Sequence, residues 1–246
     1  MDKFASGEGM IFAGSVVLVA GGTGGLGRAV SLAFLSEGAG VVVTYRDDGE
    51  FAGLKGAAGA NASRLAGRRV DVTDEAAVQG LMEGILAEYG RLDALVNTVG
   101  GYAGGKAMWE LDVGDFDKML DLNLRSGFLL SRAAAKAMLE RGTGAIVNVA
   151  SKSALDHEAG VAAYAASKAA AVAMLDSLAA DLRGSGVRAN SILPSVIDTE
   201  ANRKAMPGAD FAKWPKPKDI ARVILFLCGD EAKAVHGAAI PVYGNG

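Results

Sequence analysis

Short β-branched runs alternate with longer helical patterns along nearly all of this 246-residue chain, and this alternation restricts the possible folds more than any other feature. The runs lack the apolar–polar alternation of half-buried strands, so both of their faces should be buried. Such strands separated by helices indicate a parallel sheet covered by helices on both faces. We expect strands at Val16–Ala20, Gly40–Thr44, Arg68–Val70, Ala94–Asn97, Ala145–Ala150, Val187–Leu193 and Ala239–Val242. We expect helices at Gly25–Glu37, Asp74–Tyr89, Val113–Glu140, Val161–Gly184 and Lys218–Cys228, with only a weak helical pattern at Asp48–Ala62. No linker or repeat divides the chain, so we predict one doubly wound α/β domain, residues 1–246, with a seven-stranded sheet.

Composition excludes several classes of function. The formal net charge of −3 offers no basic excess for nucleic acid, and the longest apolar runs are far too short to span a bilayer. The first residues lack the cationic and apolar regions of a secretory signal, so we expect a cytoplasmic protein. Cys228 is the only cysteine, and with His157 and His236 it does not make a plausible zinc cluster, so we expect no metal.

A glycine-rich turn follows the first predicted strand and precedes the first predicted helix. Gly22, Gly24 and Gly27 fit the spacing G-x-G-x-x-G, whereas Gly21, Gly25 and Gly27 fit G-x-x-x-G-x-G. Glycines in such a turn let the backbone approach a pyrophosphate, which then rests on the amide groups at the start of the helix. A plain tight turn would have the same composition, but this position between strand and helix favours dinucleotide binding and a Rossmann fold.

The end of the second predicted strand bears on the choice of coenzyme. An NAD site often has an acid here to hold the ribose hydroxyls, whereas an arginine suits the 2′-phosphate of NADP. Tyr45 occupies the place of that acid, its ring could lie along the adenine, and Arg46 follows it. Asp47 and Asp48 come next and could neutralise Arg46 or turn it outward, and a solvated Arg46 without a ligand is the alternative. The pattern favours NADP(H) over NAD(H).

Three polar residues further along are candidate site residues. Asp71 could accept a hydrogen bond from the adenine amino group, or could belong to a helix start near Thr73. Asn97 could brace the sheet and border the cofactor, or could be an ordinary turn residue. Asn123 lies inside an otherwise apolar helical stretch. Asparagine lowers helix propensity there, so its presence needs a structural or catalytic reason.

Tyr164 and Lys168 are four residues apart in a predicted helix, so they share one face. An ammonium close to the phenol would lower the pKa of Tyr164 from its ordinary value of about 10 towards the range of acid–base catalysis. Ser151 follows the fifth predicted strand, and its hydroxyl could hold a carbonyl oxygen beside that phenol. A half-buried tyrosine with a lysine extending past it would show the same spacing, so the pair gains weight only from the other motifs.

Together these motifs resemble those of the short-chain dehydrogenase/reductase family, in its short single-domain branch and with a likeness to 3-oxoacyl-carrier-protein reductases. The resemblance covers nearly the whole chain from Val16 and rests on Gly21, Gly25, Gly27, Asp71, Asn97, Gly100, Asn123, Ser151, Tyr164, Lys168, Asn190–Pro194 and Thr199. It implies a catalytic tetrad of Asn123, Ser151, Tyr164 and Lys168. It also implies that the coenzyme is bound by Gly21, Thr23, Gly24, Gly25, Leu26, Gly27, Tyr45, Arg46, Asp71, Val72, Asn97, Gly100, Tyr164, Lys168, Pro194, Ile197 and Thr199.

The resemblance implies an NAD(P)(H)-dependent oxidoreductase that interconverts a carbonyl and an alcohol. Tyr164 would pass a proton to or from the substrate oxygen while Ser151 holds that oxygen. Lys168 would bind the nicotinamide ribose and lower the pKa of Tyr164. Asn123 would help to hold a water that links Lys168 to solvent.

The chain departs from the family pattern in three places. Ala20 replaces the threonine that usually opens the glycine motif, and Thr98 and Val99 stand where Asn-Ala is more familiar. These changes should alter local hydrogen bonds without removing the cofactor loop. Ser195 replaces a glycine after the sixth strand and could stiffen or reposition the loop there.

The substrate is the least determined property. Apolar side chains in two variable segments, one of them a short lid near residues 200–216, favour a fairly apolar carbonyl or alcohol. These side chains are Tyr102, Met108, Trp109, Met206, Phe211 and Trp214. Arg203, Lys204 and Lys213 could meet an anionic carrier such as an acyl thioester, or could form a solvated face of the lid.

The family resemblance leaves two alternative functions to weigh and suggests an assembly. A dinucleotide-sensing regulator without chemistry is an alternative, but such proteins usually lack part of the tetrad. An epimerase or dehydratase of the extended branch would need a longer chain. Alanines crowd the predicted helix Val161–Leu182, which the family commonly pairs with the preceding helix between subunits, and Ala239–Gly246 resembles a second interface. We therefore expect a homotetramer.

Overall fold

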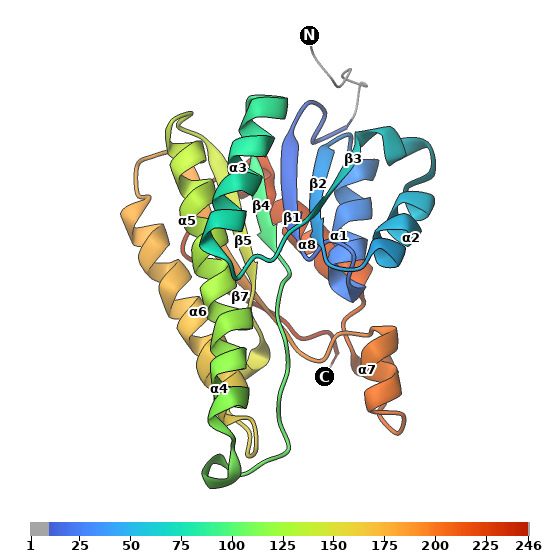
Figure 1. Cartoon of the computed structure of the whole chain (residues 1–246), viewed down its shortest axis with the longest axis vertical. Coiled ribbons are helices and arrows are strands. Elements are labelled where there is room, and N and C mark those ends of the chain that lie inside the picture. The colour runs from blue at the N-terminus through green and yellow to red at the C-terminus, as the bar shows by residue number, and fades with distance from the viewer. Residues whose placement is uncertain (1–9, 246) are drawn as a thin grey trace.

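The computed structural model describes residues 10–245, and Figure 1 shows a central sheet between two layers of helices. All seven strands are parallel and follow the order β3-β2-β1-β4-β5-β6-β7. The strands are β1 (Val16–Ala20), β2 (Gly40–Tyr45), β3 (Leu65–Arg69), β4 (Ala94–Asn97), β5 (Gly144–Val149), β6 (Val187–Pro194) and β7 (Ala239–Val242). The predicted seven-stranded, doubly wound Rossmann fold is confirmed.

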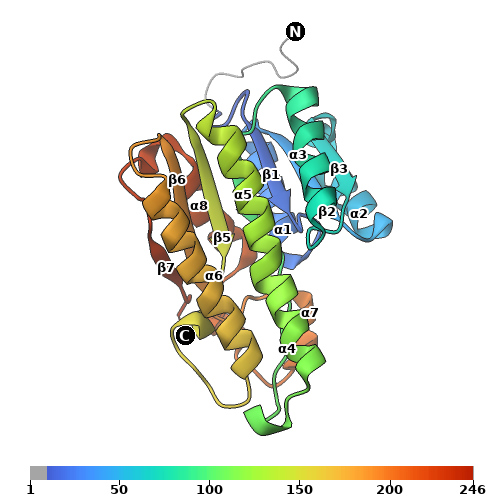
Figure 2. The same ribbon diagram turned by 60° about the vertical axis from the view of Figure 1, so that its left-hand side comes forward.

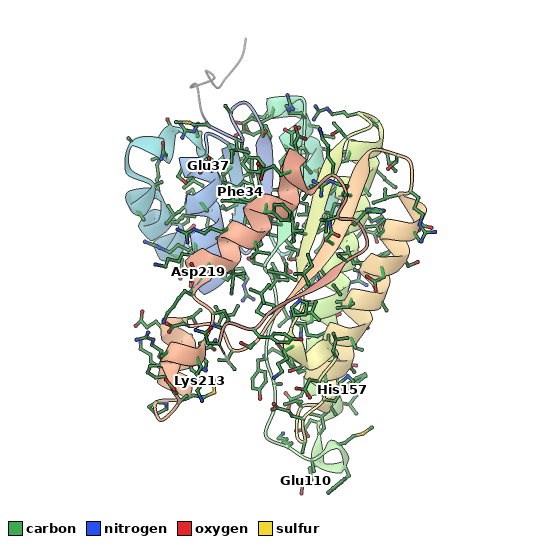
Figure 3. The ribbon with its side chains drawn as sticks, turned by 180° about the vertical axis from the view of Figure 1, so that it is seen from behind. Phe34, Glu37, Glu110, His157, Lys213 and Asp219 are labelled. Atoms are coloured by element: carbon green, nitrogen blue, oxygen red, sulfur yellow. The ribbon has the colours of Figure 1, made fainter. Side chains whose placement is uncertain are left out.

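The two faces of the sheet bury separate cores. Val17 and Val19 of β1 face one core with α1 (Gly25–Ser36) and α8 (Pro217–Cys228), where Phe34 is fully buried (Figure 3). Val16 and Leu18 face the other core with α3 (Glu75–Tyr89), α5 (Ser126–Leu139) and α6 (Ala162–Asp181). Figure 2 shows α5 and α6 side by side over this second face. Because neighbouring residues of a strand point to opposite faces, both faces of β1 are apolar, as the sequence predicted.

The third strand was predicted too late in the chain. β3 pairs with β2 from Val41–Leu65 to Tyr45–Arg69, so it begins at Leu65 and not at Arg68. The ring of Phe51 from α2 (Asp48–Ala58) covers Gly67, where a Cβ would lie 2.4 Å from the ring carbon Cζ. A glycine and two arginines on an edge strand give little apolar pattern, which explains the error.

The predicted helix Val113–Glu140 is interrupted. It consists of α4 (Val113–Leu120), a π-helical segment at Asp121–Arg125 and α5. Asn123 lies in that segment and is almost completely buried. A π-helical turn inserts one residue and often marks a functional site, so the polar residue and the irregularity share one cause.

The candidate residues lie along the edge of the sheet that the carboxyl ends of its strands form. Strand order reverses between β1 and β4, and ligands of doubly wound folds bind beyond the carboxyl ends of the strands at such a point. At the same edge, a short helix that the sequence did not predict, α7 (Glu200–Ala205), begins the segment 200–216 (Figure 1).

Candidate active site

The amides of Gly21, Gly22 and Gly24 in the glycine turn donate to acceptors within the protein, whereas the amides at the start of α1 are left open. Gly24 caps α1 in an extended conformation, and no side chain bonds to the first amides of the helix. Gly27 packs against Gly21, where a Cβ would lie 2.1 Å from the carbonyl oxygen, and Gly21 has φ +72°. Only glycine fits at these two places. The open amides at a helix N-terminus fit the pyrophosphate of a dinucleotide.

Two threonine side chains hydrogen-bond to the backbone at Ala20 and Gly21. The amide of Gly21 donates to Oγ1 of Thr44 at 2.9 Å. The hydroxyl of Thr98 donates to the carbonyl oxygen of Ala20 at 2.7 Å. Thr98 and Ala20, two of the departures from the family pattern, are therefore in direct contact across β1 and β4.

The carboxyl ends of β1, β2 and β4 surround a cavity of about 320 Å³. It is lined by Gly21, Thr23, Gly24, Thr44, Tyr45, Arg46, Asp47, Glu50, Val70, Asp71, Val72, Thr73, Thr98, Val99, Gly100 and Leu122. Most of the residues predicted to bind the adenosine end of a coenzyme therefore lie in one place. Leu26 and Gly25 are in the first turn of α1 beside it, where Leu26 is buried.

The side chains at the end of β2 are disposed in a way that leaves Arg46 exposed. Tyr45 stacks on Phe51, with ring centroids 4.7 Å apart and an interplanar angle of 6°, so one face of its ring is covered. Asp47 accepts a hydrogen bond from the amide of Glu50 and caps α2, while Asp48 pairs with Arg69. Asp47 and Asp48 thus bond to Glu50 and Arg69, so of the possibilities that the sequence left open, neutralisation of Arg46 by these acids is not seen.

Asp71 keeps an ionised carboxylate in the cavity. Its Oδ1 accepts hydrogen bonds from both the hydroxyl and the amide of Thr73, and these bonds, with a smaller contribution from the charge of Arg46, lower the pKa of Asp71. The helix α3 begins with the cap Asp74 and not with Asp71. Asp71 is thus free of the helix-start role that the sequence left open.

Two asparagines link neighbouring strands below the site. Nδ2 of Asn97 donates to Oδ1 of Asn148 at 2.9 Å, and Oδ1 of Asn97 accepts from the amide of Val99 at 3.1 Å. Both side chains are buried, and Gly127 of α5 leaves room for them. Asn97 therefore braces β4 against β5 and fixes the loop that follows. Asn148 was missed, although a polar residue within the run Ala145–Ala150 was a visible signal.

Asn123 fixes the next part of that loop. Its Oδ1 accepts from the amide of Gly101 at 2.9 Å, and its Nδ2 donates to the carbonyl oxygen of Gly101 at 3.1 Å and to Oγ of Ser167 at 3.0 Å. A Cβ on Gly100 would lie 2.8 Å from this Oδ1 and 3.1 Å from Nζ of Lys168. Asn123, Gly100 and Lys168 are thus packed together.

Tyr164 and Ser151 meet as predicted. Ser151 follows β5 and is buried, and Tyr164 is a half-buried residue in the first turn of α6. The hydroxyl of Ser151 bonds to the phenol, which favours the phenolate, but burial has the larger effect and raises the pKa of Tyr164. The phenol of Tyr102 also raises that pKa. Because burial dominates and the ammonium of Lys168 donates to Val149, the structure does not confirm that Lys168 lowers the pKa of Tyr164, and this effect stays a prediction.

Lys168 points to the end of β5. Its Nζ donates to the carbonyl oxygen of Val149 at 3.0 Å, and the residue is only 6% exposed. Burial lowers the pKa of Lys168 from 10.5 to about 8. The ammonium is therefore poorly solvated, and no carboxylate among residues 10–245 pairs with it. It lies close to Gly100, where a bound ligand could reach it.

Tyr102, one of the side chains expected to line a substrate pocket, reaches the phenol of Tyr164. The ring of Tyr102 meets the ring of Tyr164 edge to face, with centroids 5.0 Å apart at 70°. Met108 and Trp109 instead line a separate groove of about 530 Å³ along the alanines of α6, and the lining of this groove does not include Tyr164. The prediction that Met108 and Trp109 face the substrate is therefore not supported.

The segment after β6 closes the other side of the site. The methyl of Thr199 packs on Gly25, where a Cβ would lie 2.8 Å away. Ile197, which packs on the core of α1 and α8, accepts the amide of Thr199 through its carbonyl, and Pro194 ends β6. Ser195 donates its hydroxyl to the carbonyl oxygen of Tyr243 at 2.8 Å, so it ties the loop to the chain after β7.

The cations of the segment 200–216 are largely paired. Asp198 holds Arg203 through two hydrogen bonds and Lys216 through another, which lowers the pKa of Asp198. Lys204 pairs with Glu200 at 2.7 Å. Arg203 also lies over the ring of Phe211. These contacts favour the second reading of the lid cations, a charged outer face, over contact with an anionic carrier.

Residues 10–245 offer neither a cluster of metal ligands nor a helix that could span a membrane. This part of the chain contains no group of three or more His, Cys, Asp or Glu residues that could hold a metal ion. None of its helices has the length and apolar character needed to cross a bilayer.

Comparison with known proteins agrees with this geometry. The family model for short chain dehydrogenase matches residues 15–210. D-threitol dehydrogenase of Mycolicibacterium smegmatis is 36% identical over 94% of this chain and 92% of its own length. A 3-oxoacyl-(acyl-carrier-protein) reductase of Thermotoga maritima is 30% identical over 94% of this chain and 97% of its own length. The solved structure of ElxO with NADP bound has a TM-score of 0.88 at 26% identity, over 94% of this chain and 97% of that one.

The glycine turn, the serine and the tyrosine–lysine pair thus occupy one edge of a fold that these relatives share. The chain belongs to the short-chain dehydrogenase/reductase family and is an NAD(P)-dependent oxidoreductase acting on alcohol or carbonyl substrates.

Proposed function

We propose that Tyr164, Ser151, Lys168 and Asn123 carry out the reaction of this enzyme. A bound nicotinamide coenzyme would supply or accept the hydride. Tyr164 donates a proton from its phenol to the substrate oxygen during reduction, and Ser151 holds that oxygen through its hydroxyl. The observation that carries the proposal is the bond between these two groups, one helical turn from the buried ammonium of Lys168.

Lys168 and Asn123 have distinct parts in this proposal. The ammonium of Lys168 would bind ribose hydroxyls, and its charge would stabilise the phenolate left after proton donation. Asn123 positions the loop at Gly101 and keeps Gly100 close to Lys168. The water link to solvent that the family resemblance implies for Asn123 stays a prediction.

Tyr164→Phe tests the proton donor. The variant should bind coenzyme normally, because the ring is retained, but turnover should fall by about 10²–10⁴-fold. The assay is a carbonyl panel followed by coenzyme absorbance, with coenzyme binding measured separately. Turnover within a few-fold of wild type on an identified substrate would exclude Tyr164 as the donor.

We further propose that the enzyme favours NADP(H). Support comes from the exposed Arg46, from Tyr45 in the place of the usual acid, and from the related ElxO, which was solved with NADP bound. The free Oδ2 of Asp71 would accept the adenine amino group. Arg46→Ala should raise the dissociation constant of NADPH by about ten- to a hundredfold and leave that of NADH nearly unchanged. Equal losses for both coenzymes would mean that Arg46 only shapes the adenosine pocket.

We propose that residues 200–216 form a lid over the substrate within a single domain. The segment is attached at Asp198 and contacts the glycine turn through Thr199, so its position is coupled to the coenzyme site. The contact of Tyr102 with Tyr164 favours a fairly apolar carbonyl or alcohol beside the phenol. A cytoplasmic location also stays a prediction.

The proposed assembly is a homotetramer. Phe128 and Leu139 on α5 are 45% and 48% exposed, and Val113 at the start of α4 is 74% exposed. Trp109 is 88% exposed beside the alanine groove of α6. Apolar side chains over one pair of neighbouring surface helices are typical of a subunit interface. Sedimentation at micromolar concentration should give a tetramer, and a monomer would overturn this part of the proposal.

A further inference from the structure

One carboxylate of the coenzyme cavity has no part in the proposed chemistry. Glu50 lies in the first turn of α2, and its Oε2 accepts a hydrogen bond from the buried hydroxyl of Thr23 at 2.8 Å. Thr23 is in the glycine turn, next to the cap Gly24 of α1. The bond therefore holds a negative charge against the turn that would receive a coenzyme.

The other charged side chains of this cavity do not bond to the glycine turn. Asp47 is bound to the start of α2 and Asp71 is bound to Thr73. Arg46 is the only cation in the lining given by residues 10–245, against three carboxylates. Arg28 of α1 lies nearby but outside this lining, close to Gly53 of α2. A cavity lined by one cation and three carboxylates attracts a phosphate less strongly than Arg46 alone would.

We propose that Glu50 is a coenzyme-selecting residue that opposes the 2′-phosphate favoured by Arg46. This inference rests on the proposed function and concerns the same site. The 2′-phosphate of NADP, placed between Arg46 and the glycine turn, would meet like charge on Glu50 and would compete with it for the Thr23 hydroxyl. The free hydroxyls of NAD carry no charge and can donate hydrogen bonds to a carboxylate. The protein should therefore accept both coenzymes, with a smaller preference for NADP(H) than its arginine would give.

Glu50→Gln tests this role because glutamine keeps the shape and an acceptor for Thr23 but removes the charge. Dissociation constants of NADPH and NADH would be measured by titration calorimetry on the full chain. For NADPH the constant should fall about tenfold, the effect of removing one repulsive charge at short range. For NADH it should change by less than about twofold. The gain for NADPH should shrink at about 0.5 M salt, because salt screens exposed charges.

Glu37→Gln is the matched control. It makes the same change of charge at the C-terminal end of α1, which Figure 3 shows at the far end of the helix from the segment 200–216, and it should leave both constants unchanged. An equal change for both coenzymes in Glu50→Gln, or the same gain in Glu37→Gln, would overturn the inference. If wild-type protein bound neither coenzyme, the proposed function would fail together with it. Normal binding without a selective gain would overturn the inference alone.

Discussion

Lys168→Met should make the protein more stable while it removes activity. Burial lowers the pKa of Lys168 from 10.5 to about 8, so the charged ammonium costs the folded state about 3 kcal/mol near neutral pH, since one pKa unit corresponds to about 1.4 kcal/mol. Methionine fills a similar volume without charge, but it leaves the carbonyl of Val149 without its donor, at a cost of about 1 kcal/mol. The net gain is about 2 kcal/mol, or about 4–8 °C in Tm for a chain of this length.

The gain in stability of Lys168→Met over the wild type should depend on pH. Below about pH 8, Lys168 is protonated in the folded and unfolded states and its full cost is present. Between about 8 and 10.5 the folded protein releases this proton while the unfolded chain keeps it, so wild-type stability rises with pH and the advantage of the variant shrinks. Above 10.5 the advantage disappears.

Urea unfolding at several pH values between about 6.5 and 9.5 would measure this difference. Lys136→Met is the matched control, because Lys136 is exposed on α5 and should give no comparable gain. The reasoning is refuted if Lys168→Met lowers stability at neutral pH, or if its gain is the same at every pH. Turnover in the variant should fall by at least about a hundredfold, since the charge that stabilises the phenolate is lost.

Three further predictions concern the same edge of the sheet. Gly27→Ala should weaken coenzyme binding by more than about tenfold, because its Cβ would lie 2.1 Å from the carbonyl oxygen of Gly21, whereas Gly24→Ala, with its nearest atom 3.6 Å away, should stay within about threefold; calorimetry decides. Asn123→Ala should lower the free energy of unfolding by about 2–3 kcal/mol, because two part-buried backbone groups of Gly101 and the buried hydroxyl of Ser167 lose this partner; a loss below about 0.5 kcal/mol in urea unfolding would contradict this. Because burial raises the pKa of Tyr164, alcohol oxidation should increase with pH while carbonyl reduction persists at neutral pH, and parallel profiles for the two directions would count against it.

Much of the fold could be predicted because burial leaves a pattern in the sequence. β1 and β4 begin and end where expected, since strands buried on both faces are continuous apolar runs. β7 is an edge strand and only partly buried, but its four residues are still an apolar run, so it was also located correctly. β3 was misplaced because its residues form no such run, and Gly67 is there to make room for Phe51.

The site could be predicted in its members more than in its contacts. A buried asparagine within a helix indicated that Asn123 had a special role, but it did not indicate a π-helical turn or a bond to Gly101. The partnership of Thr23 with Glu50 joins residues 27 positions apart, on two different helix starts, and no local pattern encodes it. Such contacts depend on how α1 and α2 pack, which a one-dimensional pattern does not contain.

The acidity of Tyr164 shows the limit of reasoning from spacing. A four-residue interval places Lys168 on the same helix face, but it does not determine which acceptor takes the ammonium or how much water each group loses. In the structure the ammonium donates to Val149 and both groups are desolvated. Desolvation favours the neutral form of each, so it raises the pKa of the phenol and lowers that of the lysine. A neutral phenol is the form that donates a proton. The structure therefore presents Tyr164 in the form that carbonyl reduction requires, and the phenolate that alcohol oxidation requires would need stabilisation by the charge of Lys168 or by groups of the bound reactants.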